Sequence, residues 1–148
     1  MATFQTSIIP DPKDPSQPLK TPNGQTIRRP LLKVELLGSD GDALFETRAL
    51  VDSGADTTMV NAEFALALGI DLSTEKEIDV KGIYAEPIKG RASHIRLRLV
   101  DLNVEMTLPA IFVYSGNVNV LLGREAFFQQ YNVRFCIAKN RFEIKKPR

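Results

Sequence analysis

The sequence contains only one cysteine, Cys136, and only one histidine, His94. A single cysteine cannot close a disulfide within the chain, and a single histidine gives no cluster with the spacing of metal ligands. Metal-assisted hydrolysis is therefore not expected, and we expect neither a metal nor any other cofactor.

The same scarcity argues against nucleophilic catalysis by cysteine or serine. Cys136 lies in the alternating run 133–137, which is typical of a strand and offers no local feature that would activate a thiol. His94 lies in the alternating run 93–99, where a polar side chain needs no special role. A Cys136–His94 pair, or a Ser-His-Asp triad built on His94, is the less favoured alternative.

Long apolar runs and an excess of one charge are also missing. The 19 basic and 18 acidic residues nearly cancel, so no overall field favours nucleic acid or a membrane surface, although the tail 145–148 is locally basic. No apolar run approaches the roughly 20 residues that span a bilayer, and the first residues lack the pattern of a charged start followed by an apolar run. We expect no nucleic-acid or membrane partner and a cytoplasmic protein.

The prolines divide the chain into two parts. Residues 1–29 are polar and have little periodicity, so they predict an extended or disordered arm. Five prolines punctuate this arm: Pro10, Pro12, Pro15, Pro18 and Pro22. Residues 30–148 consist of short apolar or alternating runs and predict one folded domain, which fits a chain of 148 residues with 43% apolar content.

Short strands separated by turn residues fill this domain. The runs that predict strands are 31–37, 44–51, 78–80, 95–100, 104–108, 111–114, 133–137 and 141–145. Start and stop signals predict two short helices, at 61–69 and 123–130. This pattern predicts a mainly β fold, a small closed barrel-like domain with one or two short helices.

Two motifs stand out within this pattern. The first, Asp52-Ser53-Gly54-Ala55, follows the apolar run 49–51, so a carboxylate is presented on a tight turn at the end of a strand. An Asp-Ser/Thr-Gly triplet alone occurs by chance in roughly one chain in ten of this length. The second motif is the apolar run 118–122, which leads into Gly123-Arg124. Together the two motifs carry more information than either does alone.

Both motifs resemble those of the retropepsin-like aspartic proteases, and the resemblance extends over residues 31–144. It implies an acid-protease fold and an aspartic endopeptidase that acts on a peptide or protein substrate. Asp52 would be the catalytic residue. Because the motif occurs once, two identical chains must meet to supply the two carboxylates, so the resemblance implies a homodimer. The strand at 141–145 is the candidate for interleaving with the partner chain.

Other residues acquire roles only through this resemblance. Ser53 would tie the two active-site turns together, and Asp56 would contact the substrate backbone and pair with Arg124, which supports the site with Gly123. The remaining residues expected to contact substrate are Leu50, Gly54, Ala55 and Leu121, with Gly82, Ile83 and Tyr84 from a flap at 80–90. Ser53 could instead be an ordinary turn residue, Asp56 a surface charge, and both leucines only core.

The predicted flap departs from the family pattern. Its tip reads Ala85-Glu86-Pro87, whereas viral relatives have a glycine-rich tip, and Pro87 removes a backbone donor and stiffens the loop. Closure of a lid normally excludes water and completes a site. The alternative function is therefore a binding or scaffold domain with the same fold and weak or no proteolysis.

Overall fold

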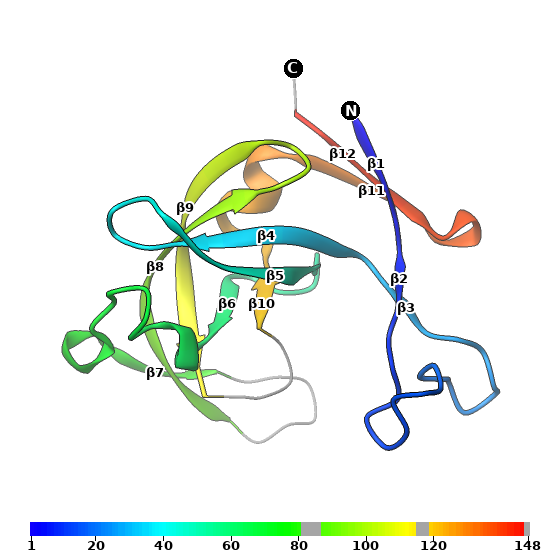
Figure 1. Cartoon of the computed structure of the whole chain (residues 1–148), viewed down its shortest axis with the longest axis horizontal. Coiled ribbons are helices and arrows are strands. Elements are labelled where there is room, and N and C mark those ends of the chain that lie inside the picture. Colours follow the sequence, from blue (N-terminus) through cyan, green and yellow to red (C-terminus); the bar gives the residue numbers. More distant parts are fainter. Residues whose placement is uncertain (81–86, 115–118, 147–148) are drawn as a thin grey trace. The chain divides into compact units, whose positions relative to one another are not determined.

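The computed structural model describes residues 1–80, 87–114 and 119–146. Two compact units make up the chain: the larger is Leu32–Gln130, and the smaller combines Met1–Leu31 with Tyr131–Arg148. Figure 1 shows the strands of both units. The two motifs lie in the larger unit.

A closed ring of strands forms the larger unit. In spatial order it contains β4 (Leu31–Leu37), β5 (Ala43–Val51), β10 (Val120–Leu122), β6 (Thr58–Asn61), β9 (Val104–Val113) and β8 (Ile88–Leu99). The ring closes because β4 also pairs with β8, through Val34↔Leu99 and Leu36↔Leu97. A further strand, β7 (Glu77–Val80), pairs with the first four residues of β8, Ile88 to Arg91 (Figure 1). The predicted mainly β, closed barrel-like fold is confirmed.

The barrel encloses a core made by alternate residues of its strands. Because successive side chains of a strand face opposite sides, every second residue is buried from Leu32 to Leu36 in β4 and from Ile95 to Leu99 in β8. Full burial of one such apolar side chain contributes about 1.5–3 kcal/mol. The fully buried members include Leu32, Val34, Leu36, Ile95, Leu97, Leu99, Leu108 and Phe112.

Strand β9 corrects one prediction. Residues 104–108 and 111–114 were expected to form separate strands, but β9 is continuous and runs through Pro109, which lies between them. Pro109 lies opposite His94 in the antiparallel ladder between β8 and β9, which continues on both sides of the proline, and the parallel ladder between β6 and β9 begins one residue later, at Ala110. Pairing with β8 therefore carries the strand through the proline.

Both predicted short helices exist only as shorter turns. At 61–69 the structure has η1 (Ala62–Phe64), a three-residue 3-10 turn, followed by further turns and a second 3-10 turn, η2 (Leu72–Thr74). The predicted start and stop are confirmed, since the Asn61 side chain accepts a hydrogen bond from Glu63 N and Gly69 has a φ of +77°. So short a segment has little helical stability of its own.

The second predicted helix, 123–130, is an irregular turn, η3 (Arg124–Phe128), in which Ala126 has a φ of +67°. Two backbone amides that would have no acceptor in the first turn of a helix donate hydrogen bonds to the loop after Asp52. Arg124 N donates to Ala55 O at 2.8 Å, and Glu125 N donates to Asp56 O at 2.9 Å. Attachment to the Asp52 loop thus replaces regular helical geometry.

The smaller unit is a three-stranded sheet in the order β1 (Ala2–Gln5), β12 (Arg141–Lys145), β11 (Asn132–Cys136), with a short 3-10 turn, η4 (Ile137–Lys139), between the last two. Phe4 stacks on the buried Phe142 with ring centroids 5.2 Å apart. Two further short strands, β2 (Ser7–Ile8) and β3 (Arg28–Arg29), pair with each other.

This sheet bears on two predictions about the chain ends. The predicted arm 1–29 is extended in parts and begins with a paired strand, and the proposed boundary between residues 29 and 30 stays a prediction. The predicted interleaving of strand 141–145 with a partner chain does not fit the observed sheet, because β12 has a strand of its own chain on each side. Intermolecular pairing would have to use β1 or β11, or displace one of them.

Candidate active site

Asp52 is held at the end of β5 by the strand beside it. Strands β5 and β10 run parallel, with Leu50 opposite Leu121 and Val51 opposite Leu122. Asp52 N then donates to Leu122 O at 3.0 Å, which continues the ladder by one bond. The buried strand therefore fixes the backbone of Asp52, while its side chain is only half-buried.

The Asp52 carboxylate is oriented by its own turn. Its Oδ1 accepts a hydrogen bond from Gly54 N at 2.9 Å, and Ala55 N donates to Asp52 O at 3.3 Å. A Cβ on Gly54 would lie 3.2 Å from Asp52 Oδ1, closer than ordinary contact. A glycine at this position therefore leaves the carboxylate room, whereas the expected contact of Gly54 with substrate stays a prediction.

The loop after β10 is attached to the turn after Asp52. Besides the backbone bonds from Arg124 and Glu125, Gly123 N donates to the hydroxyl of the buried Thr58 at 3.3 Å. A Cβ on Gly123 would lie 2.5 Å from Thr57 O, where no side chain fits. The supporting position predicted for Gly123 thus has a steric reason, whereas the contribution of Thr58 was not predicted from the sequence.

The ion pair expected between Asp56 and Arg124 is present, with Arg124 Nη2 donating to Asp56 Oδ1. In the single chain the Asp56 side chain is 84% exposed and the Arg124 side chain is 60% exposed. Exposed pairs contribute about 0–1 kcal/mol, so the backbone bonds hold the two loops together and the ion pair orients the side chains. A role for Asp56 in substrate binding stays a prediction.

A cavity of about 540 Å³ opens beside Asp52. Five of the predicted site residues line it: Asp52, Gly54, Ala55, Asp56 and Leu121. Leu50 and Ser53 are not among its lining residues, and Gly82, Ile83 and Tyr84 lie outside the described residues. The other lining residues were not predicted from the sequence; they are Thr57, Met59, Asp79, Val80 and Ile111.

Three of the lining residues form an apolar row across neighbouring strands. Leu121 of β10 lies opposite Met59 of β6, and Met59 lies opposite Ile111 of β9. Directly paired residues of adjacent strands put their side chains on the same face of the sheet. The cavity therefore has an apolar floor next to the Asp52 carboxylate.

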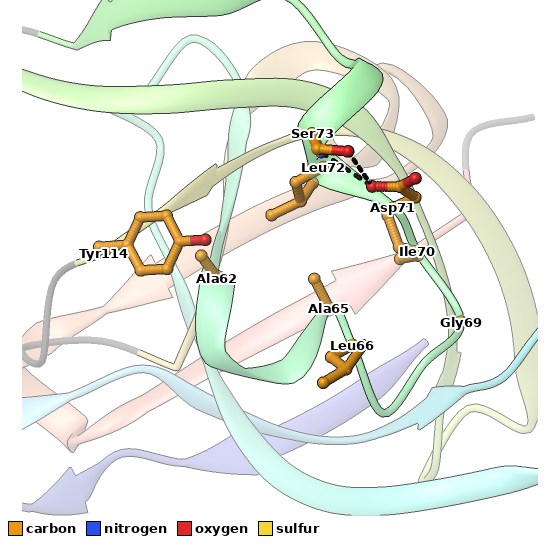
Figure 2. Close-up of a pocket in the computed structure, with 9 residues that line it drawn as sticks. All are labelled: Ala62, Ala65, Leu66, Gly69, Ile70, Asp71, Leu72, Ser73 and Tyr114. Atoms are coloured by element: carbon orange, nitrogen blue, oxygen red, sulfur yellow. Dashed lines mark hydrogen bonds between the residues drawn. The ribbon is translucent and has the colours of Figure 1, made fainter.

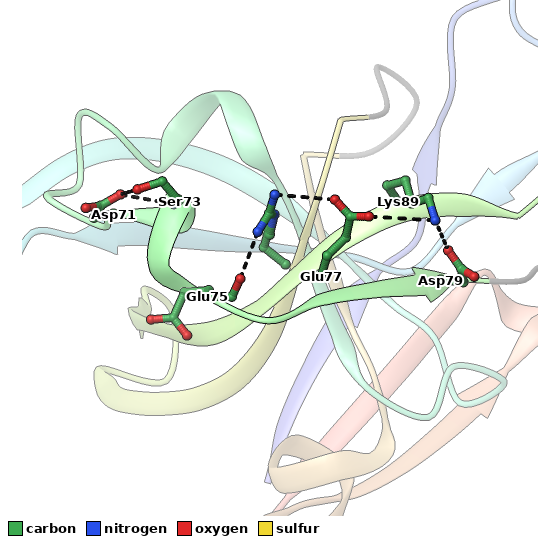
Figure 3. A network of polar contacts seen from close by, with 7 residues as sticks. Asp71, Ser73, Glu75, Glu77, Asp79 and Lys89 are labelled. Carbon is green, nitrogen blue, oxygen red and sulfur yellow. Dashed lines mark hydrogen bonds and ion pairs between the residues drawn. The ribbon is translucent and has the colours of Figure 1, made fainter.

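The β7–β8 hairpin supplies the wall of the cavity that contains Asp79 and Val80. Its polar contacts centre on Lys89, whose Nζ lies 2.7 Å from Asp79 Oδ1 and 3.7 Å from Glu77 Oε1 (Figure 3). Glu77 Oε2 also lies 3.3 Å from Arg91 Nη2. The hydrogen bond and charge of Asp79 raise the pKa of Lys89, and Glu77 adds to this effect. The arms of the predicted flap are thus present, whereas Ala85 and Glu86 of its predicted tip lie outside the described residues.

A second cavity, of about 530 Å³, contains none of the motif residues (Figure 2). Its one carboxylate, Asp71, accepts hydrogen bonds from Ser73 N at 3.0 Å and from Ser73 Oγ at 2.6 Å. These bonds lower the pKa of Asp71 and use the carboxylate to cap η2. The cavity beside Asp52 is therefore the candidate active site.

The structure describes residues 1–80, 87–114 and 119–146. These residues contain no group of three or more His, Cys, Asp or Glu side chains arranged to hold a metal ion. Their helices include none with the length and apolar character required to cross a bilayer.

Comparison with known proteins gives a family and a fold. The family model described as aspartyl protease matches residues 33–126, more than half of the chain, and this range includes both motifs. No curated protein sequence matches. A retropepsin-like aspartic protease from Rickettsia conorii matches in structure with a TM-score of 0.57 and 16% identity, covering 85% of this chain and 93% of that one.

Two viral enzymes match with lower scores. The EIAV protease, solved with an inhibitor, has a TM-score of 0.43 at 16% identity and covers 65% of this chain and 82% of its own. The simian foamy virus protease has a TM-score of 0.41 at 15% identity, covering 64% and 88%. Both scores are below 0.5, so the fold assignment depends on the rickettsial structure, and the family assignment on the matching model. The chain belongs to the aspartyl protease family and has a retropepsin-like fold.

Proposed function

We propose that this protein is a homodimeric aspartic endopeptidase in which each chain contributes one Asp52 carboxylate. The observation that carries the proposal is that a single chain presents one Asp-Ser-Gly turn, with its Asp52 carboxylate oriented by Gly54 N, beside an apolar-floored cavity. The Asp-Ser-Gly triplet occurs once in the sequence. A reaction that needs two facing carboxylates therefore needs a second copy of the chain.

The exposure of the turn supports this assembly. Ser53 and Gly54 are exposed in the single chain and Asp52 is half-buried, so the turn is accessible to an identical turn on a partner. Its backbone is held by the β10 ladder and the loop after β10, so little ordering is required when the partner binds.

The proposed chemistry follows from bringing the two carboxylates together. At about 3 Å separation and an effective dielectric near 20, two ionised carboxylates repel by roughly 5 kcal/mol, so the pair holds one proton over a wide pH range. This is the known behaviour of aspartic-protease dyads in general and is not a magnitude special to this chain. The apparent pKa values belong to the pair and not to either residue.

One shared proton makes the pair both an acid and a base. The ionised Asp52 takes a proton from a water molecule as its oxygen attacks the amide carbon, and the protonated Asp52 of the other chain donates to the carbonyl oxygen. The Gly54 N–H bond orients the carboxylate, and the row of Leu121, Met59 and Ile111 offers an apolar surface for substrate side chains.

Cleavage of a peptide library at several pH values tests this proposal. We expect acid-favoured cleavage that falls to background in Asp52→Asn, with the dimer still present by sedimentation. Asp101→Asn, which removes the same charge from an exposed turn residue, is the matched control and should cleave as the parent does. Equal cleavage by parent and Asp52→Asn, or a monomer at high concentration with peptide bound, would show the proposal to be wrong.

The competing function is a peptide-binding or scaffold domain without useful proteolysis, favoured by the proline at position 87 of the flap sequence. The same library separates the two functions. A protein that binds a peptide mimicking the tetrahedral intermediate but leaves every peptide intact would be a binding domain, whereas turnover that depends on Asp52 would exclude this alternative.

A further inference from the structure

Asp79 is a third carboxylate on the wall of the cavity that contains Asp52 and Asp56. The described residues that line this cavity include three aspartates and no lysine or arginine. Two cations stand beside it without lining it: Arg124, which pairs with Asp56, and Lys89, which pairs with Asp79. Among its described residues, the cavity surface is therefore acidic.

The ion pair between Asp79 and Lys89 is open to solvent, so another cation can replace Lys89 on Asp79. The two side chains are 56% and 68% exposed, and pairs of this kind are weak because water and salt screen them. Lys89 also has a second carboxylate within reach, since its Nζ lies 3.7 Å from Glu77 Oε1 (Figure 3). Lys89 can therefore stay paired with Glu77 if another cation takes its place on Asp79.

We propose that Asp79 selects peptides with a lysine or arginine side chain that reaches this wall, and that Lys89 turns to Glu77 when such a side chain binds. The inference rests on the proposed function, because it assigns a substrate class to the same cavity. An acidic peptide side chain is disfavoured there, since like charges across a contact repel and opposite charges set specificity.

The test uses peptides in which one position at a time carries lysine, its uncharged analogue norleucine, or glutamate. The varied positions run from three residues before the cleaved bond to three residues after it. We expect the parent to prefer lysine over norleucine in kcat/KM at one position by about two- to fivefold, the range of an exposed ion pair. The preference should shrink in high salt, because screening weakens exposed charge pairs.

Two variants separate substrate selection from a merely structural ion pair. Asp79→Asn should abolish the lysine preference, whereas Lys89→Met should increase it, because it removes the cation that competes for Asp79. If the pair only stabilised the hairpin, both variants would break it and would act in the same direction. Glu105→Gln breaks another exposed pair, 2.9 Å from Arg96, outside the cavity lining, and should leave the preference unchanged.

Binding of the same peptides to Asp52→Asn, followed by fluorescence anisotropy, separates this inference from the proposed function. If the parent cleaves nothing, the endopeptidase proposal fails, but a lysine preference in binding that Asp79→Asn removes still supports the role of Asp79. No lysine preference in either cleavage or binding, or an equal preference in Asp79→Asn, would overturn the inference.

Discussion

Replacing Gly123 with alanine tests how tightly the two active-site loops are joined. Gly123 has φ of −95° and ψ of −171°, an extended conformation that any residue adopts, so alanine has no backbone penalty there. Its Cβ, however, would lie 2.5 Å from Thr57 O, 2.6 Å from Thr57 C and 2.9 Å from Thr57 N. These are backbone atoms, so no rotamer change relieves the clash.

The size of the effect follows from these distances. Ordinary contact begins at 3.4 Å, so the strand and the loop must separate by about 0.9 Å, the difference between 3.4 and 2.5 Å. Overpacking of this kind costs about 1–3 kcal/mol. Separating the strand from the loop also stretches the hydrogen bonds that Gly123 N, Arg124 N and Glu125 N donate. Losing one such hydrogen bond costs about 0.5–1.5 kcal/mol. We expect Gly123→Ala to lower the free energy of unfolding by about 2–4 kcal/mol.

Urea unfolding followed by circular dichroism, at one protein concentration, measures this change. Gly38→Ala is the matched control, because its Cβ would meet the ends of flexible side chains, Leu44 Cδ1 at 3.0 Å and Asp40 Oδ1 at 3.2 Å. These side chains can rotate, so we expect the control to lose less than about 1 kcal/mol. A Gly123→Ala protein with the unfolding midpoint and slope of the parent would refute the steric argument.

Two further substitutions test the buried hydroxyl and the acidic cap. Thr58→Val leaves Gly123 N without its acceptor and should lower the free energy of unfolding by about 1–3 kcal/mol. Thr58→Ser keeps the hydroxyl and should lower it by less. Equal losses of the two variants in urea unfolding would contradict the role of the hydroxyl. The hydrogen bonds from Ser73 lower the pKa of Asp71 in the folded protein below its ordinary value of 3.8. The ionised carboxylate therefore stabilises the fold at pH values above 3.8, and this stabilisation is lost as the pH falls through the lower pKa of the folded protein. Thermal unfolding of Asp71→Ala should therefore show a deficit at pH 7 that shrinks in acid, and a deficit independent of pH would be evidence against the argument.

Local sequence signals predicted several features correctly. Alternating or apolar runs predicted β4, β5 and β12 because burial on one side of a sheet requires them. The side chain of Asn61 and the backbone freedom of Gly69 act within a few residues, so the turn between them was also predictable.

Other features were missed because distant residues decide them. Strand β6 is only four residues long and has little pattern of its own, but it lies between β10 and β9 in the ring. The helix signals at 123–130 were present, yet the carbonyls of Ala55 and Asp56 take amides from this segment. Contacts across nearly 70 positions of sequence override a weak local preference there.

The sequence alone determined the chemical groups of the candidate site, their order and the turn that presents Asp52, because strand ends, glycines and hydrogen bonds within a turn are local. Only the tertiary structure brought Met59, Ile111 and Asp79 to the same cavity, and only it showed that β12 lies between two strands of its own chain. The physical reason is that strand order and register are set by pairing between distant segments, which the properties of neighbouring residues do not encode.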